Sequence, residues 1–245
     1  MKKSSLLRTV FFSFFAATGL CPGAAAWAQN AIAPGEYLGA SGGGALMVSP
    51  AAGGAQKFTL EANGANGHTC GVDGEIRGRQ ARVPAEEGQP ACVIDFKAKG
   101  DDFDVTGSDT CRFFCGARAT IDGPYLKPAA GCRSAEIKKT RAQFKQAYDR
   151  KDYAGARTLL TPLLANCNKT MGDFEDSSIR NDLAVTLYHL NDLAACRQVL
   201  ESMRELAGMD DQALADNYPP SDAETYRPLA RAARTNLRLC KGSVK

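Results

Sequence analysis

Few side chains of this 245-residue chain are placed to carry out nucleophilic or acid–base chemistry. The only histidines are His68, in a glycine-rich turn, and His189, on a predicted helix, so we expect them in different domains. A Ser-His-Asp or Cys-His arrangement would need one of them as its base. The chain also lacks an H-E-x-x-H pattern and a phosphate-binding loop. We therefore expect no catalytic residues, no cofactor and no enzyme activity.

Acidic residues gather at one predicted hairpin turn, at Asp101, Asp102 and Asp104. Paired carboxylates can hydrolyse glycosides when they flank the scissile bond. The neighbouring Gly100 favours a tight turn, so we interpret these acids as solvent-exposed turn residues. An envelope hydrolase that depends on His68 or Asp102 is the alternative.

The first 28 residues predict a cleaved signal peptide. Basic residues precede an uncharged apolar run from 9 to 20, and Ala26 and Ala28 are small residues at the two positions that a signal peptidase reads. We expect cleavage near Ala28 and a periplasmic or secreted protein that begins at Gln29. The apolar run is shorter than the roughly 20 residues of a membrane-spanning helix, so we predict no membrane span. A lipid anchor at Cys21 is disfavoured by the bulky residue before it.

Eight of the nine cysteines follow the predicted signal peptide. An oxidising compartment favours their pairing as disulfides. If each repeat is an antiparallel helical hairpin, the start of its first helix lies beside the end of its second, which predicts the pair Cys132–Cys167. By the same reasoning, the end of the capping helix returns to the start of the preceding helix, which predicts the pair Cys196–Cys240.

The other four cysteines, Cys70, Cys92, Cys111 and Cys115, allow three connectivities. Counting residues around the predicted hairpin turn at 99–101 places Cys92 near Cys111, so we favour this pair together with Cys70–Cys115. A metal or redox centre is the alternative for these cysteines. Three residues separate Cys111 from Cys115 where a redox pair has two, and the second close pair of a zinc ribbon is missing. We therefore expect no metal site.

Residues 29–132 predict an antiparallel β domain. From Gly35 to Ile121, short segments alternate apolar and polar residues between glycine-containing turns, which is the pattern of half-buried strands in hairpins. We count seven or eight such segments. A meander of this length favours a small closed barrel or a curled sheet, because closure removes exposed strand edges. A two-sheet sandwich is the alternative.

Residues 133–245 predict a helical domain with an internal repeat. The apolar pattern from Phe144 to Leu163 recurs with an offset of 40, from Ala184 to Met203. The turn Lys151-Asp152-Tyr153-Ala154-Gly155-Ala156 resembles the inter-helix turn of tetratricopeptide repeats, a family that stacks helical hairpins and usually binds other proteins. The chain departs from that family at Phe144, where a small residue is usual, and in its longer period.

Two further segments complete the predicted helical domain. The extra residues of the longer repeat fall in the polar stretch 168–178, as an insertion in a loop would. The segment from Tyr226 to Cys240 has the apolar stripe of a helix that caps such a stack. We expect Pro228 to limit where its regular part begins.

Two hairpin segments of the β half carry a recognisable pattern. They are Ala40-Ser41-Gly42-Gly43-Gly44-Ala45 and Phe96-Lys97-Ala98-Lys99-Gly100-Asp101-Asp102. These segments resemble the active loops of C-type periplasmic lysozyme inhibitors, a family of small disulfide-bonded antiparallel barrels. The resemblance implies that Ser41 and Lys99 enter a lysozyme cleft, where the lysine pairs with a catalytic carboxylate. The two segments lie farther apart than in that family, and Ala98 replaces its aromatic residue.

Charge argues against nucleic acid as a partner. The three basic residues of the predicted signal peptide account for the formal net charge of +3, and no run of three basic residues follows them. We expect a non-catalytic protein-binding module that acts on a protein or a cell-envelope component. The alternatives are a lysozyme-inhibitor-like protein, a small-ligand carrier and the envelope hydrolase. A barrel interior filled by Phe58, Val72, Ile94 and Phe96 would argue against the carrier.

Overall fold

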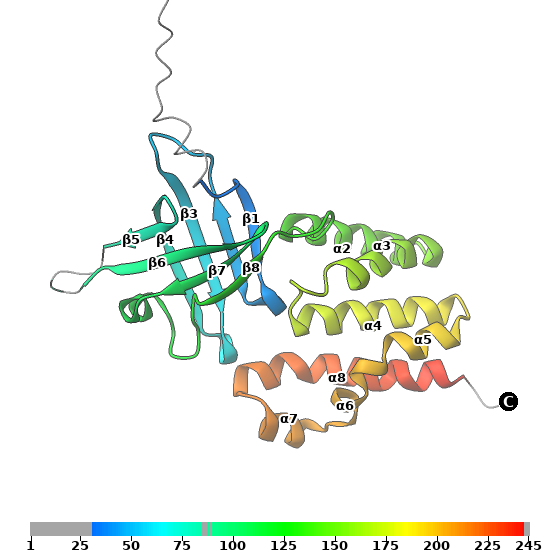
Figure 1. Cartoon of the computed structure of the whole chain (residues 1–245). Coiled ribbons are helices and arrows are strands. Elements are labelled where there is room, and N and C mark those ends of the chain that lie inside the picture. Colours follow the sequence, from blue (N-terminus) through cyan, green and yellow to red (C-terminus); the bar gives the residue numbers. More distant parts are fainter. Residues whose placement is uncertain (1–30, 85–87, 89, 243–245) are drawn as a thin grey trace, which may run out of the picture.

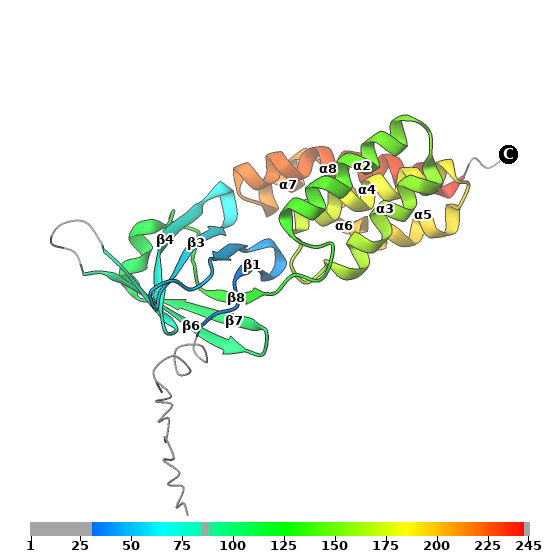
Figure 2. The same ribbon diagram turned by 90° about the horizontal axis from the view of Figure 1, so that it is seen from above.

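The computed structural model describes residues 31–84, 88 and 90–242, so the predicted signal peptide lies outside the described residues. An antiparallel β-barrel is followed by a group of helices, and the two parts lie side by side (Figure 1). Figure 2 shows the same arrangement from above. The predicted combination of a β part and a helical part is therefore confirmed.

Eight strands form a closed barrel in which each strand pairs with its neighbours in the sequence. The barrel closes between β1 and β8, where Leu38 pairs with Leu126 and Gly39 with Tyr125. The closed barrel is confirmed, and the alternative of a sandwich is wrong. The strands are β1 (Gly35–Gly39), β2 (Gly44–Val48), β3 (Gln56–Asn63), β4 (Thr69–Arg77), β5 (Gln80–Val83), β6 (Cys92–Lys99), β7 (Asp102–Gly107) and β8 (Gly123–Leu126).

The alternation of residue types along the strands builds the barrel core. Along β3, buried and exposed side chains alternate without interruption. Phe58, Val72, Ile94 and Phe96 belong to one buried cluster and are each at most 3 % exposed. Apolar side chains thus fill the barrel as they fill other protein cores, which argues against a small-ligand carrier.

The eighth strand lies outside the region where the sequence predicts strands. The predicted strand pattern ends at Ile121, whereas β8 begins at Gly123 and contains Pro124. Proline cannot donate a hydrogen bond to a neighbouring strand, so it weakens the sequence signal of a strand. β8 is accordingly short, but its Tyr125 is buried in the barrel core.

The described helical part consists of two antiparallel hairpins, α2–α3 and α4–α5, followed by the 3-10 helix η4 (Glu201–Met203) and three further α-helices. The last helix, α8, packs against α4, α5, α6 and α7. The helices are α2 (Ser134–Asp149), α3 (Tyr153–Asn166), α4 (Asp173–His189), α5 (Leu193–Val199), α6 (Arg204–Gly208), α7 (Asp211–Asn217) and α8 (Pro220–Lys241).

The turns within the two hairpins are built in the same way. Lys151 and Asn191 both adopt left-handed backbone conformations, with φ of 63° and 58°. The next residues, Asp152 and Asp192, accept hydrogen bonds from the backbone N–H three residues later, at 2.9 and 3.1 Å. Each aspartate therefore caps the N-terminus of the second helix of its hairpin. The offset of 40 residues in the sequence corresponds to a repeated local structure.

Two features of the helical part differ from the prediction. Pro228 does not limit the start of the last helix, because α8 begins at Pro220 and contains Pro228 in its interior. Proline suits the first turn of a helix, and the burial of Tyr226 and Ala230 on either side of Pro228 outweighs the missing hydrogen bond. The short helices α6 and α7 are absent from the sequence prediction.

All four predicted cysteine pairs are present as disulfides. Two of them lie in the barrel and two in the helical part, with Cα–Cα distances from 4.0 to 5.6 Å. The pairs are Cys70–Cys115, Cys92–Cys111, Cys132–Cys167 and Cys196–Cys240.

A reciprocal pair of hydrogen bonds joins the barrel to α8. The connection between β3 and β4 contains the short 3-10 helix η2 (Ala65–Gly67). The side-chain oxygen of Asn66 accepts a hydrogen bond from the N–H of Ser221 at 2.9 Å, and the carboxylate of Asp222 accepts one from the N–H of Asn66 at 3.0 Å. Pro219, which precedes α8, supplies no side-chain cap. Asn66 therefore caps α8 from a distant part of the chain.

A second contact joins the barrel to the start of α4. It is made by η1 (Ala40–Gly42), the 3-10 helix between β1 and β2. The N–H of Ser41 donates to the carbonyl oxygen of Lys169 at 2.9 Å. A β-carbon on Gly42 would lie 2.5 Å from the Cα of Gly172, so this approach requires glycine at position 42. The two contacts fix the barrel against the first turns of α4 and α8.

Removing the Cys196–Cys240 disulfide measures its contribution to stability. The bond joins cysteines 44 positions apart. Opening a loop of this length costs roughly 4 kcal/mol in the chain-entropy model. We expect Cys196→Ala with Cys240→Ala to lower the free energy of unfolding by about 2–4 kcal/mol in chemical denaturation. An unchanged free energy of unfolding would contradict this expectation.

Replacing Asn66 tests the cap between the two parts of the chain. Glycine tolerates the φ of 61° at this position, so Asn66→Gly removes the side chain without adding backbone strain. We expect a loss of about 1 kcal/mol and faster amide hydrogen exchange in the first turn of α8. Asp152→Ala, which removes a cap of α3, is the matched control and should leave exchange in α8 unchanged. Equal exchange in α8 for both variants would count against the cap.

Candidate functional site

Two hollows lie next to each other, one at the junction of the barrel and the helices and one between α2 and α4. The first, of about 520 Å³, lies between β1, β2 and β3 and the starts of α2 and α4. The second, of about 510 Å³, lies between α2 and α4. Arg141 lines both hollows where they meet, and we refer to the two together as the α2–α4 groove.

Arg141 connects the two helical walls of this groove. From α2 it donates hydrogen bonds to the Ser178 hydroxyl at 2.9 Å and to the Asp182 carboxylate at 3.2 Å, both on α4. The side chains of Arg141 and Asp182 are 29 and 34 % exposed, so water screens this ion pair less than a fully exposed one. Burial raises the pKa of the Asp182 carboxyl above its ordinary value, and the Arg141 guanidinium partly opposes the rise.

The walls of the α2–α4 groove carry charges of both signs. Lys138, Arg141 and Lys145 line it from α2, at spacings of three and four residues that place them on one helix face. Asp149 of α2 also lines the groove and forms an ion pair with Lys145 at 2.8 Å, and Glu175 and Asp182 line it from α4. A ligand in the groove would therefore meet mainly cations on the α2 side and carboxylates on the α4 side.

Aromatic rings close the end of the groove that lies farthest from the barrel. The ring of Tyr148, which lines the groove, lies 5.4 Å from that of Tyr153 and 5.9 Å from that of His189. Tyr153 and His189 are stacked, with ring centroids 4.3 Å apart. Burial raises the pKa of the Tyr148 hydroxyl, and Tyr153 and Asp182 add to the rise.

The structure does not bring together the two residues that the lysozyme-inhibitor resemblance singles out. Ser41 lies in the connection that follows β1, and Lys99 lies at the end of β6. In an antiparallel meander, connections that follow odd and even strands lie at opposite ends of the strands. The backbone of Ser41 contacts the helical part through Lys169, whereas Lys99 forms an ion pair with Asp104 of its own hairpin.

The acidic residues of the β6–β7 turn bind neighbouring groups. Asp102 accepts a hydrogen bond from the N–H of Lys127 at 2.8 Å, and Asp101 lies 3.5 Å from the Lys127 ammonium group. These contacts hold the segment that leaves β8 toward the helical part. The carboxylates thus have a structural role in positioning this segment.

Ser41 stands in a sequence of the form G-x-S-x-G, from Gly39 to Gly43. In hydrolases this pattern places the serine on a turn between a strand and a helix. Here it forms a 3-10 turn between two strands. Of the two histidines, His68 lies against Gly116 in the β7–β8 connection and His189 stacks on Tyr153. Within the described ranges, neither histidine is hydrogen-bonded to this serine.

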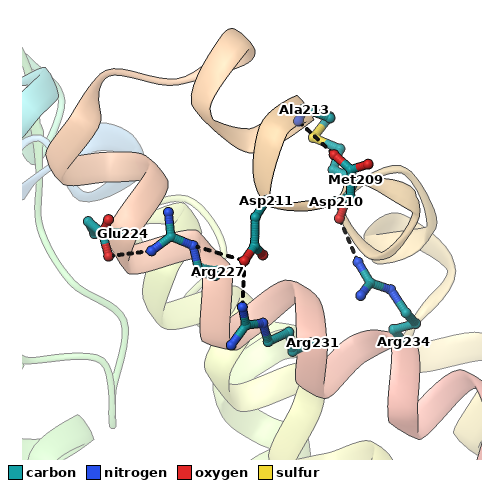
Figure 3. Close-up of polar contacts among 8 residues, drawn as sticks. All are labelled: Met209, Asp210, Asp211, Ala213, Glu224, Arg227, Arg231 and Arg234. Atoms are coloured by element: carbon teal, nitrogen blue, oxygen red, sulfur yellow. Dashed lines mark hydrogen bonds and ion pairs between the residues drawn. The ribbon is translucent and has the colours of Figure 1, made fainter.

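A cluster of charged residues joins α7 to α8 (Figure 3). Asp211 of α7 contacts Arg231 at 2.5 Å and Arg227 at 3.7 Å, and Arg227 also binds Glu224 at 2.6 Å. Arg234 donates to the carbonyl oxygens of the last turn of α6 and of the residue that follows it, at 2.9 and 2.5 Å. These arginines are used to hold α6 and α7 on α8, so we assign this cluster a structural role.

Comparison with known proteins does not indicate a function, so a function has to be inferred from the geometry of the chain itself. No family model, no curated protein and no solved structure matches this chain. Among the helices that the structure describes, none is long and apolar enough to cross a membrane. In the same residues, no group of three or more His, Cys, Asp and Glu side chains could hold a metal ion.

The sequence analysis did not identify the residues of the α2–α4 groove. One signal was available, because Phe144 stands in the first repeat where the second has the smaller Ala184. Phe144 lines the groove and is buried, as is Ala184. The pairing of Arg141 with Asp182 depends on the distance between two helices, which the sequence pattern does not determine.

The raised pKa of Asp182 predicts a pH-dependent contribution to stability. The native state retains the proton of this carboxyl to higher pH than the unfolded chain does, so the free energy of unfolding falls as pH rises through this interval. Asp182→Asn keeps an acceptor for Arg141 but does not titrate. We expect the stability of the variant relative to wild type to increase between about pH 4 and neutral pH.

Thermal unfolding at a series of pH values measures this difference. Asp149→Asn, which removes an exposed carboxylate from the same groove, controls for the loss of one negative charge. If the difference in stability between wild type and Asp182→Asn stays constant with pH, the Asp182 carboxyl has the same pKa in the native and unfolded states, which would contradict the prediction.

Proposed function

We propose that this protein is an exported, non-catalytic binding protein that holds a polypeptide segment of a protein or cell-envelope partner in the α2–α4 groove. The observation that carries the proposal is that two hollows adjoin at Arg141 and together extend from the barrel wall to the space between α2 and α4. A long, shallow groove with charges on both walls suits an extended chain better than a compact small molecule.

The construction of the helical part supports this proposal. The two hairpins share the same capped turn, and they resemble tetratricopeptide-like repeats in this respect. Stacked hairpins of this kind form concave surfaces that bind partners. The α2–α4 groove lies between the first helices of the two hairpins.

The disulfides support an exported location. Four disulfides and the lack of a membrane-spanning helix among residues 31–84, 88 and 90–242 fit a periplasmic or secreted protein. Export would also require the predicted signal peptide, residues 1–28, which lies outside the described residues.

The polar groups of the groove favour binding over catalysis. Asp182 is the groove carboxyl with a raised pKa, and such carboxyls are candidates for acid catalysis. Its carboxylate is however engaged by Arg141, which also binds Ser178, so these groups tie two helices together. The ring of His189, at the end of the groove, is likewise engaged in a structural contact, because it stacks on Tyr153.

The charges of the walls indicate the kind of segment that fits. Acidic side chains of the partner would face Lys138 and Lys145 on α2, and basic ones would face Glu175 on α4. We therefore expect a segment of mixed charge. A lysozyme-inhibitor-like role receives less support, because Ser41 and Lys99 lie in hairpins at opposite ends of the strands.

Site-specific photo-cross-linking tests the proposed groove. A photoreactive phenylalanine analogue at position 138 or 145 should give a cross-linked product in periplasmic extract. The same analogue at Thr158, an exposed position on α3, should give none. Reversing the charge of the α2 wall with Lys138→Glu and Lys145→Glu should weaken binding of the cross-linked partner about tenfold. Equal cross-linking from positions 138, 145 and 158 would rule out the groove as the binding site.

A further inference from the structure

One of the four disulfides differs from the others in its exposure to solvent. Of the eight disulfide-bonded cysteines, seven are at most 3 % exposed. The eighth, Cys115, is partly exposed and directly follows the 3-10 helix η3 (Asp109–Phe114) in the β7–β8 connection. It lines a hollow of about 360 Å³, which Cys111 also lines although it is only 3 % exposed. The bond of Cys115 to Cys70 is therefore the most accessible of the four.

The position of this bond suits attack by an external thiolate. A thiolate displaces one sulfur of a disulfide in line with the S–S bond, so it must reach the attacked sulfur from the side opposite to the other sulfur. Cys70 is 2 % exposed and belongs to the barrel core, whereas Cys115 packs at the edge of that core. The side of Cys115 that faces away from Cys70 is therefore the side toward solvent. Because Asp109, Arg112 and Asp122 all line the hollow, its charges have both signs, and access rather than charge distinguishes this bond.

The same disulfide lies behind the connection that caps α8. The N–H of Gly116 donates a hydrogen bond to the backbone of β4 at 2.9 Å, and a β-carbon on Gly116 would lie 2.5 Å from Nδ1 of His68. A β-carbon on Gly64 would clash with the carbonyl oxygen of Arg118. The β7–β8 connection thus packs against the β3–β4 connection on both sides of Asn66, whose side chain caps α8. In both views, the hairpin of β3 and β4 ends beside the start of α8 (Figures 1 and 2).

We propose that Cys70–Cys115 is a thiol–disulfide exchange site, at which a dithiol reduces the bond by attack on Cys115. The first thiolate of the reductant forms a bond to Sγ of Cys115, the bond between the two cysteines breaks, and Cys70 leaves as a thiolate that takes up a proton. The second thiol of the reductant then attacks this mixed disulfide and releases Cys115. The dithiol is oxidised to a disulfide, and its two electrons reduce the protein bond.

Reduction at this site would loosen the cap of α8 and leave the barrel closed. The Cys92–Cys111 disulfide would still hold η3 to β6, and the closure between β1 and β8 does not involve Cys115. The contacts of the β7–β8 connection with the β3–β4 connection would lose their covalent support. Asn66 would then cap α8 for a smaller fraction of the time. This exchange site is independent of the proposed function of the groove.

Limited reduction of the folded, oxidised protein tests the site. Dithiothreitol is added at neutral pH without denaturant, free thiols are trapped with N-ethylmaleimide, and the labelled cysteines are identified by peptide mass spectrometry. We expect Cys70 and Cys115 to be labelled about tenfold faster than any other pair, because access limits exchange at the buried bonds. The labelling rate should barely change in urea below the unfolding transition, because the folded protein is attacked.

Two outcomes of this experiment would overturn the proposal. The first is that another pair is reduced before Cys70–Cys115. The second is that all four pairs are reduced together at a rate that rises steeply with urea, which would show that exchange passes through unfolding. A monothiol identifies the attacked sulfur, since glutathione should form its mixed disulfide with Cys115, and an adduct on Cys70 instead would contradict the proposed direction of attack.

Hydrogen exchange measures the coupling of this bond to α8. Cys70→Ala with Cys115→Ala should speed amide exchange about tenfold in the β3–β4 connection and in the first turn of α8. Cys92→Ala with Cys111→Ala removes the other disulfide of the same connection and should leave exchange in α8 unchanged. Circular dichroism would establish that each variant is folded.

The same measurement on the selectively reduced wild-type protein replaces the first variant if that variant does not fold. Unchanged exchange at the start of α8 in folded protein that lacks the Cys70–Cys115 bond would overturn the coupling. Equal acceleration in both double variants would also overturn it, because the effect would then not be specific to this bond.

Discussion

The α2–α4 groove depends on contacts between the barrel and the starts of three helices. The connection after β3 meets the first turn of α8, where backbone N–H groups lack partners within the helix, and Asn66 satisfies one of them. The connection after β1 meets the residues before α4, where Gly42 permits an approach at backbone distance. Glu36 of β1 accepts a hydrogen bond from the N–H of Ser134 at the start of α2, at 3.2 Å. The position of the groove thus follows from contacts at the starts of these helices.

The disulfides complement these contacts, because each half of the chain forms its own core. Two disulfides lie in the barrel and two in the helical part, and none crosses between them. Small cores bury a limited apolar area, and covalent links compensate by restricting the unfolded chain. Apart from the backbone segment 127–133, the junction between the halves is held by non-covalent contacts. Stability within each half and geometry between the halves therefore have different physical origins.

Local patterns allowed much of the fold to be predicted from the sequence. Strand alternation and glycine turns predicted the barrel. The repeated pattern around Asp152 and Asp192 predicted the two hairpins and, through the first of them, the Cys132–Cys167 disulfide, and the capping helix predicted Cys196–Cys240. The eighth strand escaped prediction because Pro124 obscures its pattern, and α8 extends past Pro228 because burial outweighs local propensity. The groove could not be predicted, since it depends on contacts such as that of Asn66 with α8. Those residues are separated by 155 positions and carry no shared pattern.

The double attachment of the barrel has a mechanical consequence for the helices. A stack of helical hairpins in which each unit touches only its neighbours can stretch and twist like a spring. In this protein the barrel contacts both α4 and α8, so a change in the spacing of these two helices would have to break one of the contacts. The barrel therefore restricts how far the helical part can stretch or twist.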